Sequence, residues 1–172
     1  MIPQIKKILY TTDLSDNSAY VFRYAINFAK RHDTKIIILH VLEQTPPIIE
    51  ALVGSEITAG EQKKIVREKI AYTLDRIEKR LEIFCEKELK DDPECKDRVE
   101  SVEVREGFPP NAILRLADER DCDVIIMGTH AKGVLANTFL GSTAKRVLRR
   151  TRKPVFIIPL PKGELDITFR DI

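Results

Sequence analysis

A loop and the helix expected after it carry positive charge with no acidic residue among them. From Gly128 to Lys153 there is no Asp or Glu, and the basic residues are Lys132, Lys145, Arg146, Arg149, Arg150, Arg152 and Lys153. Unpaired amides in the first turn of a helix, together with the helix dipole, attract anions such as phosphate. Residues 141–143, at the expected start of this helix, therefore indicate an anion-binding site, to which the hydroxyls of Ser142 and Thr143 would add donors.

Five short runs rich in β-branched residues alternate with helix-length amphipathic segments. The runs cover residues 5–11, 35–41, 99–104, 123–128 and 154–160; the expected helices cover about 15–31, 61–90, 109–120 and 142–151, with Ser15 as the N-cap of the first. Near-continuous apolarity in the second, fourth and fifth runs indicates strands buried on both faces, as in a parallel sheet. The alternation predicts an α/β domain with βαβ crossovers in an open, doubly wound sheet.

The expected carboxyl ends of the strands gather polar and small residues. These are Thr11, Thr12 and Asp13 after the first strand, His40 and Val41 at the second, and Met127, Gly128 and Thr129 at the fourth. Open α/β sheets bind ligands beyond these ends, at the switch point where the crossover direction reverses. Asp13 is a lone carboxylate, which is more typical of a hydrogen-bond acceptor or helix cap than of a catalytic acid. His40 and His130 have no carboxylate or cysteine partner at a spacing typical of a catalytic or metal site, so we expect each to be a polar spacer or a contact of the ligand loop.

Composition excludes several classes of protein. The chain has 172 residues, enough for one domain, and a formal net charge of only +2, so a general coating for nucleic acid or membrane is not indicated. No signal peptide or membrane span is expected from its short apolar runs. The three cysteines are odd in number and lack metal-ligand spacing, which favours a reducing compartment, a cytoplasmic location and no metal site.

The segment between the second and third expected strands differs in character. Residues 44–60 form a connector punctuated by Pro and Gly, and residues 61–90 show an apolar stripe among many charges, which predicts one long amphipathic helix. We interpret this helix as packing on the sheet with a solvated charged face. A partner-binding coiled coil is the alternative, although the apolar seam lasts for few heptads.

The order of these features resembles that of one known family. The pattern Gly128-x2-Ala131-x9-Gly141-Ser142, between "DVIIMG" and "KPVFIIP", is similar to the G-x2-G-x9-G-(S/T) loop of ATP-binding universal stress proteins. The stretches "KKILYTTDLSDNS", "KIIILHV" and "VREGFPPNAILRLADERDCDVIIMG" are also similar to that family. The resemblance covers about residues 5–43 and 99–160 and implies a Rossmann-like five-stranded sheet of order 3-2-1-4-5 with helices on both faces.

The resemblance also implies a site and partners. The residues that it assigns to an adenine nucleotide are Thr12, Asp13, Val41, Met127, Gly128, Thr129, Ala131, Gly141, Ser142 and Thr143. ATP is the implied ligand, with AMP or ADP as alternatives and Mg²⁺ accompanying the phosphates. The chain departs from the family pattern at Thr11, where proline is common, and at Ala131, where the phosphate loop usually has its second glycine. A homodimer through the edge strand Val155–Leu160 is implied as well.

We therefore expect residues 1–172 to form a single universal stress protein domain, with 44–98 as a variable insertion and 161–172 as a tail of unassigned role. The expected function is that of a stress-response regulator in which bound ATP serves as a conformational signal, with at most slow hydrolysis. The alternative is a non-nucleotide member acting as a dimeric interaction module. A P-loop NTPase is not supported because G-x4-GK-(S/T) is absent. A receiver domain is disfavoured because Lys153-Pro154 precedes the fifth strand. Nucleic-acid binding is disfavoured because no aromatic residues lie among the basic residues from Lys145 to Lys153, where they could stack on bases.

Overall fold

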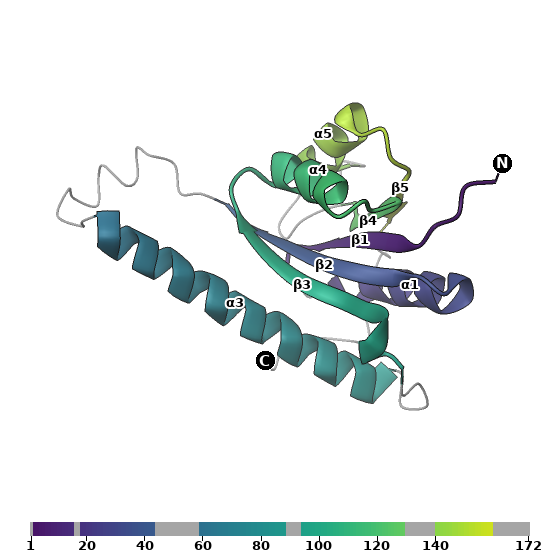
Figure 1. Cartoon of the computed structure of the whole chain (residues 1–172), viewed down its shortest axis with the longest axis horizontal. Helices are drawn as coiled ribbons and strands as arrows, with labels where there is room; N and C mark the ends of the chain where they lie inside the picture. Colours follow the sequence, from purple (N-terminus) through teal and green to yellow (C-terminus); the bar gives the residue numbers. More distant parts are fainter. Residues whose placement is uncertain (1, 16–17, 44–58, 89–93, 130–139, 160–172) are drawn as a thin grey trace.

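The fold is a five-stranded parallel sheet of order β3-β2-β1-β4-β5, which confirms the predicted fold class (Figure 1). The computed structural model describes residues 2–15, 18–43, 59–88, 94–129 and 140–159. Its elements are β1 (Lys7–Thr12), α1 (Ser18–His32), β2 (Lys35–Leu42), α3 (Ala59–Glu88), η1 (Lys96–Arg98), β3 (Val99–Glu106), α4 (Pro109–Glu119), β4 (Val124–Gly128), α5 (Ser142–Arg150) and β5 (Val155–Ile158). Of the predicted connector at 44–60, residues 44–58 lie outside the described residues and the last two belong to α3, and the tail at 161–172 also lies outside them.

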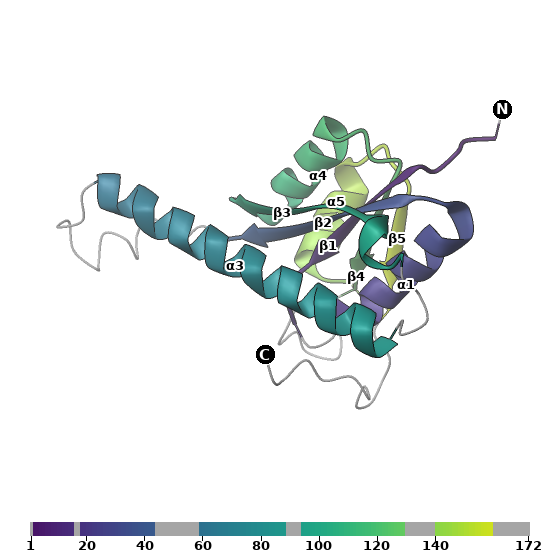
Figure 2. The same cartoon turned by 60° about the horizontal axis from the view of Figure 1, so that its bottom comes forward.

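The central strands bury alternate residues in two separate cores. Ile8 and Tyr10 of β1 pack under α1 and α3, whereas Leu9 between them packs under α4 and α5. In β2, Ile36 and Ile38 alternate with Ile37 and Leu39 in the same way, because successive side chains of a strand point to opposite faces. This two-sided burial explains the continuous apolar runs, and the helices accordingly cover both faces (Figure 2).

Helices α1 and α4 end in the same C-terminal capping motif. Asp33 and Asp121, which follow these helices, both have a φ of 50°, in the left-handed region. In each case the next residue donates its N–H to the carbonyl five residues back, at 3.2 Å after α1 and 2.9 Å after α4. This is the Schellman arrangement, in which a residue that tolerates left-handed geometry reverses the chain. The two reversals direct the chain into β2 and β4, whose carboxyl ends then lie beside that of β1.

Helix α3 is longer than the sheet that it covers. It has 30 residues and spans about 45 Å, and its first turns extend past the strands (Figure 1). From Thr73 onward it packs on the sheet through buried Thr73, Ile77 and Phe84, whereas Ile65 and Tyr72 nearer its start are exposed. The amphipathic stripe thus predicted the helix correctly, but the domain covers it only from about Ile70 onward.

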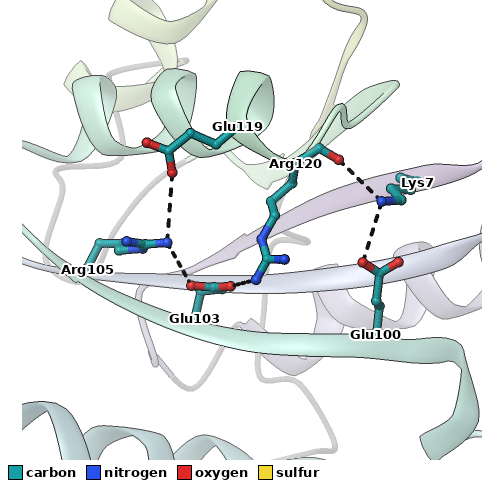
Figure 3. Close-up of polar contacts among 6 residues, drawn as sticks. All are labelled: Lys7, Glu100, Glu103, Arg105, Glu119 and Arg120. Carbon is teal, nitrogen blue, oxygen red and sulfur yellow. Dashed lines mark hydrogen bonds and ion pairs between the residues drawn. The ribbon is translucent and has the colours of Figure 1, made fainter.

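Charged side chains line the α4 side of the edge strand β3 (Figure 3). Glu103 of β3 pairs with Arg120 and, at 3.0 Å, with Arg105, and Arg105 lies 3.8 Å from Glu119 at the end of α4. Glu103, Arg105, Glu119 and Arg120 are called the β3 charge cluster below. At the opposite edge, β5 places Phe156 partly in solvent, so the two margins of the sheet differ in chemical character.

Two of the three cysteines are paired. Cys85 at the end of α3 and Cys95 before η1 form a disulfide, and Cys122 is a buried free thiol. The cysteines therefore give no support for a reducing compartment, and the location stays a prediction. Disulfides persist mainly in oxidising compartments and in intracellular proteins of hyperthermophiles. Among the described residues, no helix combines the length and apolar character needed to span a bilayer.

Candidate functional site

A cavity of about 370 Å³ opens beyond the carboxyl ends of β1, β2 and β4. It lies at the switch point of the sheet, because the chain crosses from β1 to β2 on one side and β4 lies on the other. The described residues that line it are Tyr10, Thr11, Thr12, Asp13, Ser15, Ser18, Val21, Leu39, His40, Val41, Glu43, Pro109, Ile113, Met127, Gly128, Thr129, Gly141, Ser142, Thr143 and Ala144.

Nine of the ten residues that the family resemblance assigned to a ligand line this one cavity. They are Thr12, Asp13, Val41, Met127, Gly128, Thr129, Gly141, Ser142 and Thr143. The tenth, Ala131, lies outside the described residues, as does His130. The cavity therefore brings the strand ends and the start of α5 together, although they are far apart in the sequence.

The turn after β1 is built by its own side chains. Thr12 Oγ1 accepts a hydrogen bond from the Leu14 amide at 3.1 Å, and Asp13 Oδ1 accepts one from the Ser15 amide at 3.0 Å. These bonds hold Leu14 in the left-handed region, with a φ of 58°. Such Asx-type turns compete with helix formation within the turn itself. The described part of α1 runs from Ser18, and the residues just after Ser15, where the sequence predicted the helix to start, lie outside the described residues. Asp13 is exposed at the mouth of the cavity.

His40 at the end of β2 joins this turn from the neighbouring strand. Its Nδ1 lies 2.8 Å from the carbonyl oxygen of Thr12, and since a carbonyl only accepts, Nδ1 carries the proton and Nε2 keeps its lone pair. Burial lowers the pKa of His40, and the charges of Arg76 and Arg80 act in the same direction, while the bond to Thr12 and the charge of Asp13 oppose them. The neutral imidazole therefore serves as a hydrogen-bonded wall of the site.

Tyr10 and Ser18 close the cavity between β1 and α1. The Tyr10 hydroxyl donates to the Ser18 carbonyl at 2.7 Å, and burial raises the pKa of this phenol well above its usual range. Ser18 in turn donates its amide and hydroxyl to the Ser15 carbonyl, at 3.0 and 2.7 Å. The protonated phenol thus anchors the first turn of α1 to the strand that carries Thr12.

The start of α5 forms the other wall. The Thr129 amide donates to the Ile158 carbonyl at 3.1 Å, and the Gly141 amide donates to the Thr129 carbonyl at 2.7 Å, so the end of β4 lies against the N-cap of α5. Gly141 makes no side-chain cap, and the first turn of α5 contains no acidic residue. The amides of this turn, including those of Ser142 and Thr143, are therefore placed to donate hydrogen bonds to an anion in the cavity.

The basic side chains of α5 lie elsewhere. None of the described residues lining the cavity is Lys or Arg. Arg146 lies over the ring of Phe108, 5.0 Å from its centroid, and Arg150 donates to Asn111 Oδ1 at 2.5 Å. These cations engage α4 and its N-terminus, so the anion-binding character of the site comes from backbone amides, hydroxyls and the helix dipole.

Sequence reasoning missed Arg80, which approaches the site from α3. Its Nη1 donates to the Leu14 carbonyl at 2.7 Å, and the residue is only 9% exposed. The available signal was its helical phase, because Arg80 lies three residues after Ile77 and four before Phe84, both buried. The structure also shows no group of three His, Cys, Asp or Glu side chains arranged for a metal ion within its described part.

The family model for the universal stress protein family matches residues 4–159, and the chain therefore belongs to that family. It is 31% identical over 159 residues to Universal stress protein MJ0531 of Methanocaldococcus jannaschii, covering 92% of this chain and 85% of the relative. It is 29% identical over 164 residues to MJ0577 of the same organism, covering 89% and 94%.

Solved structures share the same fold. The structure of MJ0577 matches with a TM-score of 0.69 at 23% identity, covering 94% of this chain and 100% of that one. Universal stress protein UspA from Lactobacillus plantarum matches with a TM-score of 0.66 at 20% identity, covering 91% and 99%. At these identities the likeness concerns the fold, so the ligand must be argued from the residues of this chain.

Proposed function

We propose that this universal stress protein binds an adenine nucleotide, ATP in the first place, in the cavity between β1, β4 and α5, and uses it as a conformational signal. The observation that carries the proposal is the arrangement of the cavity: the uncapped first turn of α5 at one wall and the Asp13 carboxylate at another. Phosphates would bind at Gly141, Ser142 and Thr143. The adenosine moiety would lie along Asp13, Val41 and Met127.

Two further observations support the choice of ligand. The wall made by Leu39, Val41, Ile113 and Met127 is apolar, as a base-binding surface must be. A universal stress protein with the same fold, 21% identical and with a TM-score of 0.55, was solved in complex with cAMP. Mg²⁺ would be held mainly by the phosphates, because the cavity offers only the carboxylates of Asp13 and Glu43 among its described lining residues.

The protein would bind ATP and hydrolyse it slowly at most, acting as a cytoplasmic regulator. The sequence has no Walker A loop to place a lysine on the phosphates. The one N–H of the neutral His40 ring is bonded to the Thr12 carbonyl, so His40 has no second proton to donate to a leaving phosphate. A signalling role needs only that the occupied and empty states differ in their contacts.

We further propose that two copies pair through β5. This strand bonds only to β4 within the described sheet, and Phe156 is 38% exposed on it. An apolar edge strand favours association, and pairing about a twofold axis would satisfy it. Leu160, which belongs to the segment proposed from the sequence, lies outside the described residues.

The decisive experiment measures nucleotide content and affinity. Protein purified without added nucleotide is denatured in acid and the supernatant is analysed for ATP, ADP and AMP, and the stripped protein is then titrated with ATP and adenosine by calorimetry. Co-purified or saturable ATP, with adenosine binding more weakly, is the expected result. A stripped protein that ignores ATP at millimolar concentration, while remaining dimeric, would support the non-nucleotide interaction module instead.

A further inference from the structure

The turn that carries Asp13 is held by a residue from a distant part of the chain. Leu14, next to Asp13, has a left-handed φ of 58°, which costs a leucine energy. Its carbonyl accepts a hydrogen bond from Arg80 Nη1 at 2.7 Å, across 66 positions of sequence. A charged donor on this carbonyl favours the turn conformation that directs Asp13 to the cavity.

Arg80 is itself held firmly on α3. The residues one turn before and after it on the helix, Ile77 and Phe84, are buried in the core. Phe84 contacts Phe22 of α1 at 4.9 Å between ring centroids. Because its backbone belongs to this packed half of α3, the guanidinium approaches Leu14 from a fixed position.

Arg80 also lies directly behind the wall of the site. Arg80 and Leu14 line a small cavity of about 40 Å³ whose other lining residues include Tyr10, Thr12 and Ser18. These three residues line the main cavity from its other side. A movement of α3 would therefore shift Tyr10, Thr12 and Ser18 and so change the shape of the main cavity.

We infer that Arg80 is a positioning residue of the nucleotide site, through which α3 sets the affinity for the ligand. The inference rests on the proposed nucleotide binding and adds to it a control point on the helix. Arg80 acts on the ligand through Leu14 and Asp13 and makes no contact with the ligand itself. Without it the turn relaxes from the left-handed geometry, and the fraction of molecules competent to bind falls.

The test compares three substitutions on α3. Arg80→Met keeps an unbranched stem but removes the donor and the charge, whereas Arg80→Lys keeps a charged donor. Arg76→Met is the matched control, since Arg76 lies on the same helix and also influences His40, and its guanidinium lies over the ring of Tyr72. ATP affinity is measured by calorimetry for each folded variant.

Arg80→Met is expected to weaken ATP binding roughly five- to thirtyfold, the range for losing left-handed geometry at one residue. Arg80→Lys should restore most of this affinity, and Arg76→Met should change it less than about threefold, because a lost surface charge alone has a small effect. Equal affinities for Arg80→Met and the parent, or equal weakening by Arg76→Met, would overturn the inference.

A second readout needs no nucleotide. Hydrogen exchange of the Leu14 and Ser15 amides, which donate to Thr12 Oγ1 and Asp13 Oδ1, is followed by NMR in the empty proteins. Exchange should accelerate in Arg80→Met and stay at the parental rate in Arg76→Met; unchanged exchange in Arg80→Met overturns the inference whatever the affinities. If the parent protein does not bind ATP, the proposed function and the affinity claim both fail. If the parent binds ATP and Arg80→Met binds it equally well, only this inference fails.

Discussion

Cys85 and Cys95 are joined by a disulfide, with their Cα atoms 5.9 Å apart, that ties the last turn of α3 to the short helix before β3. The bond closes a loop of ten residues' separation at the point where the long helix returns to the sheet. It therefore restrains the buried half of α3, from which Arg80 reaches the turn after β1.

Reduction of this disulfide should destabilise the protein. Closing a loop of this length removes chain entropy from the unfolded state, so reduction or the double substitution Cys85→Ala and Cys95→Ala should lower the free energy of unfolding by about 2–3 kcal/mol. Chemical denaturation with and without reductant measures the difference. The double variant is the control, because reductant should not change its stability.

Thiol counting tests the pairing separately. Unfolded, unreduced protein should show one thiol, and folded protein should show almost none, since Cys122 is buried and burial raises its pKa to about 11. Three thiols in the unfolded, unreduced protein would contradict the disulfide.

Asp13 should contribute to nucleotide binding in two separable ways. Asp13→Ala removes both the carboxylate and the acceptor for the Ser15 amide, and should weaken ATP binding by roughly 1.5–3 kcal/mol, the range for a hydrogen bond to a charged group. Asp13→Asn keeps an oxygen for the Ser15 amide and should lose less. Calorimetry on folded variants measures both losses, and an unchanged dissociation constant for Asp13→Ala would remove Asp13 from the site.

His40 should make the domain less stable in mild acid. Because burial lowers its pKa in the folded state, the unfolded chain binds more protons just below the ordinary value of about 6.5. The free energy of unfolding should therefore fall as the pH drops through about 6.5, and this contribution should be absent above it.

The comparison variant is His40→Gln, which does not titrate. Between pH 8 and 5.5 the parent should lose more stability than this variant, and NMR should show the Nδ1-protonated tautomer with a pKa below 6.5. A His40 pKa at or above 6.5 would show that the hydrogen bond to Thr12 and the charge of Asp13 outweigh burial.

Phe156 should govern association. Phe156→Lys places a charge on the exposed edge of β5 and should convert a dimer at micromolar concentration into a monomer, as measured by sedimentation. Tyr72→Lys is the control, because Tyr72 is more exposed than Phe156 but lies on α3. A monomeric parent, or dissociation by both substitutions, would contradict pairing through β5.

Ala131→Gly should tighten ATP binding. This prediction rests on the sequence pattern, in which Ala131 stands at the usual second glycine of the phosphate loop. If the bound loop requires left-handed geometry there, alanine costs about 1–2 kcal/mol, so glycine should tighten ATP roughly five- to thirtyfold and leave adenosine nearly unaffected. Equal gains for ATP and adenosine would place the residue away from the phosphates.

The parts of the fold that follow from local patterns were predictable. The apolar runs around Ile8–Tyr10 and Ile36–Leu39 specify strands buried on both faces, and residues 141–143 mark the start of α5 where the structure has it. Periodicity and capping act over a few residues, so the sequence displays them directly.

Contacts between distant segments were not predictable in the same way. A separation of ten residues between Cys85 and Cys95 does not reveal that the chain doubles back there. The charge of Arg80 suggested a solvated face, although its helical phase placed it among buried residues. The basic residues of α5 suggested a cationic pocket, but Arg146 and Arg150 contact α4, and the amides of the first turn face the cavity.

The β3 charge cluster bears on how far self-association can proceed. A strand added along β3 would meet Glu103 and Arg105 on one face of that margin, and fixed charges at an edge oppose the addition of an apolar strand. An assembly that forms through β5 would bury the apolar margin of each copy and leave the two β3 margins, with Glu103 and Arg105 on one face, at its ends. Growth of the proposed assembly would then stop at two chains, whereas a sheet with two apolar margins could polymerise copy by copy into a fibre.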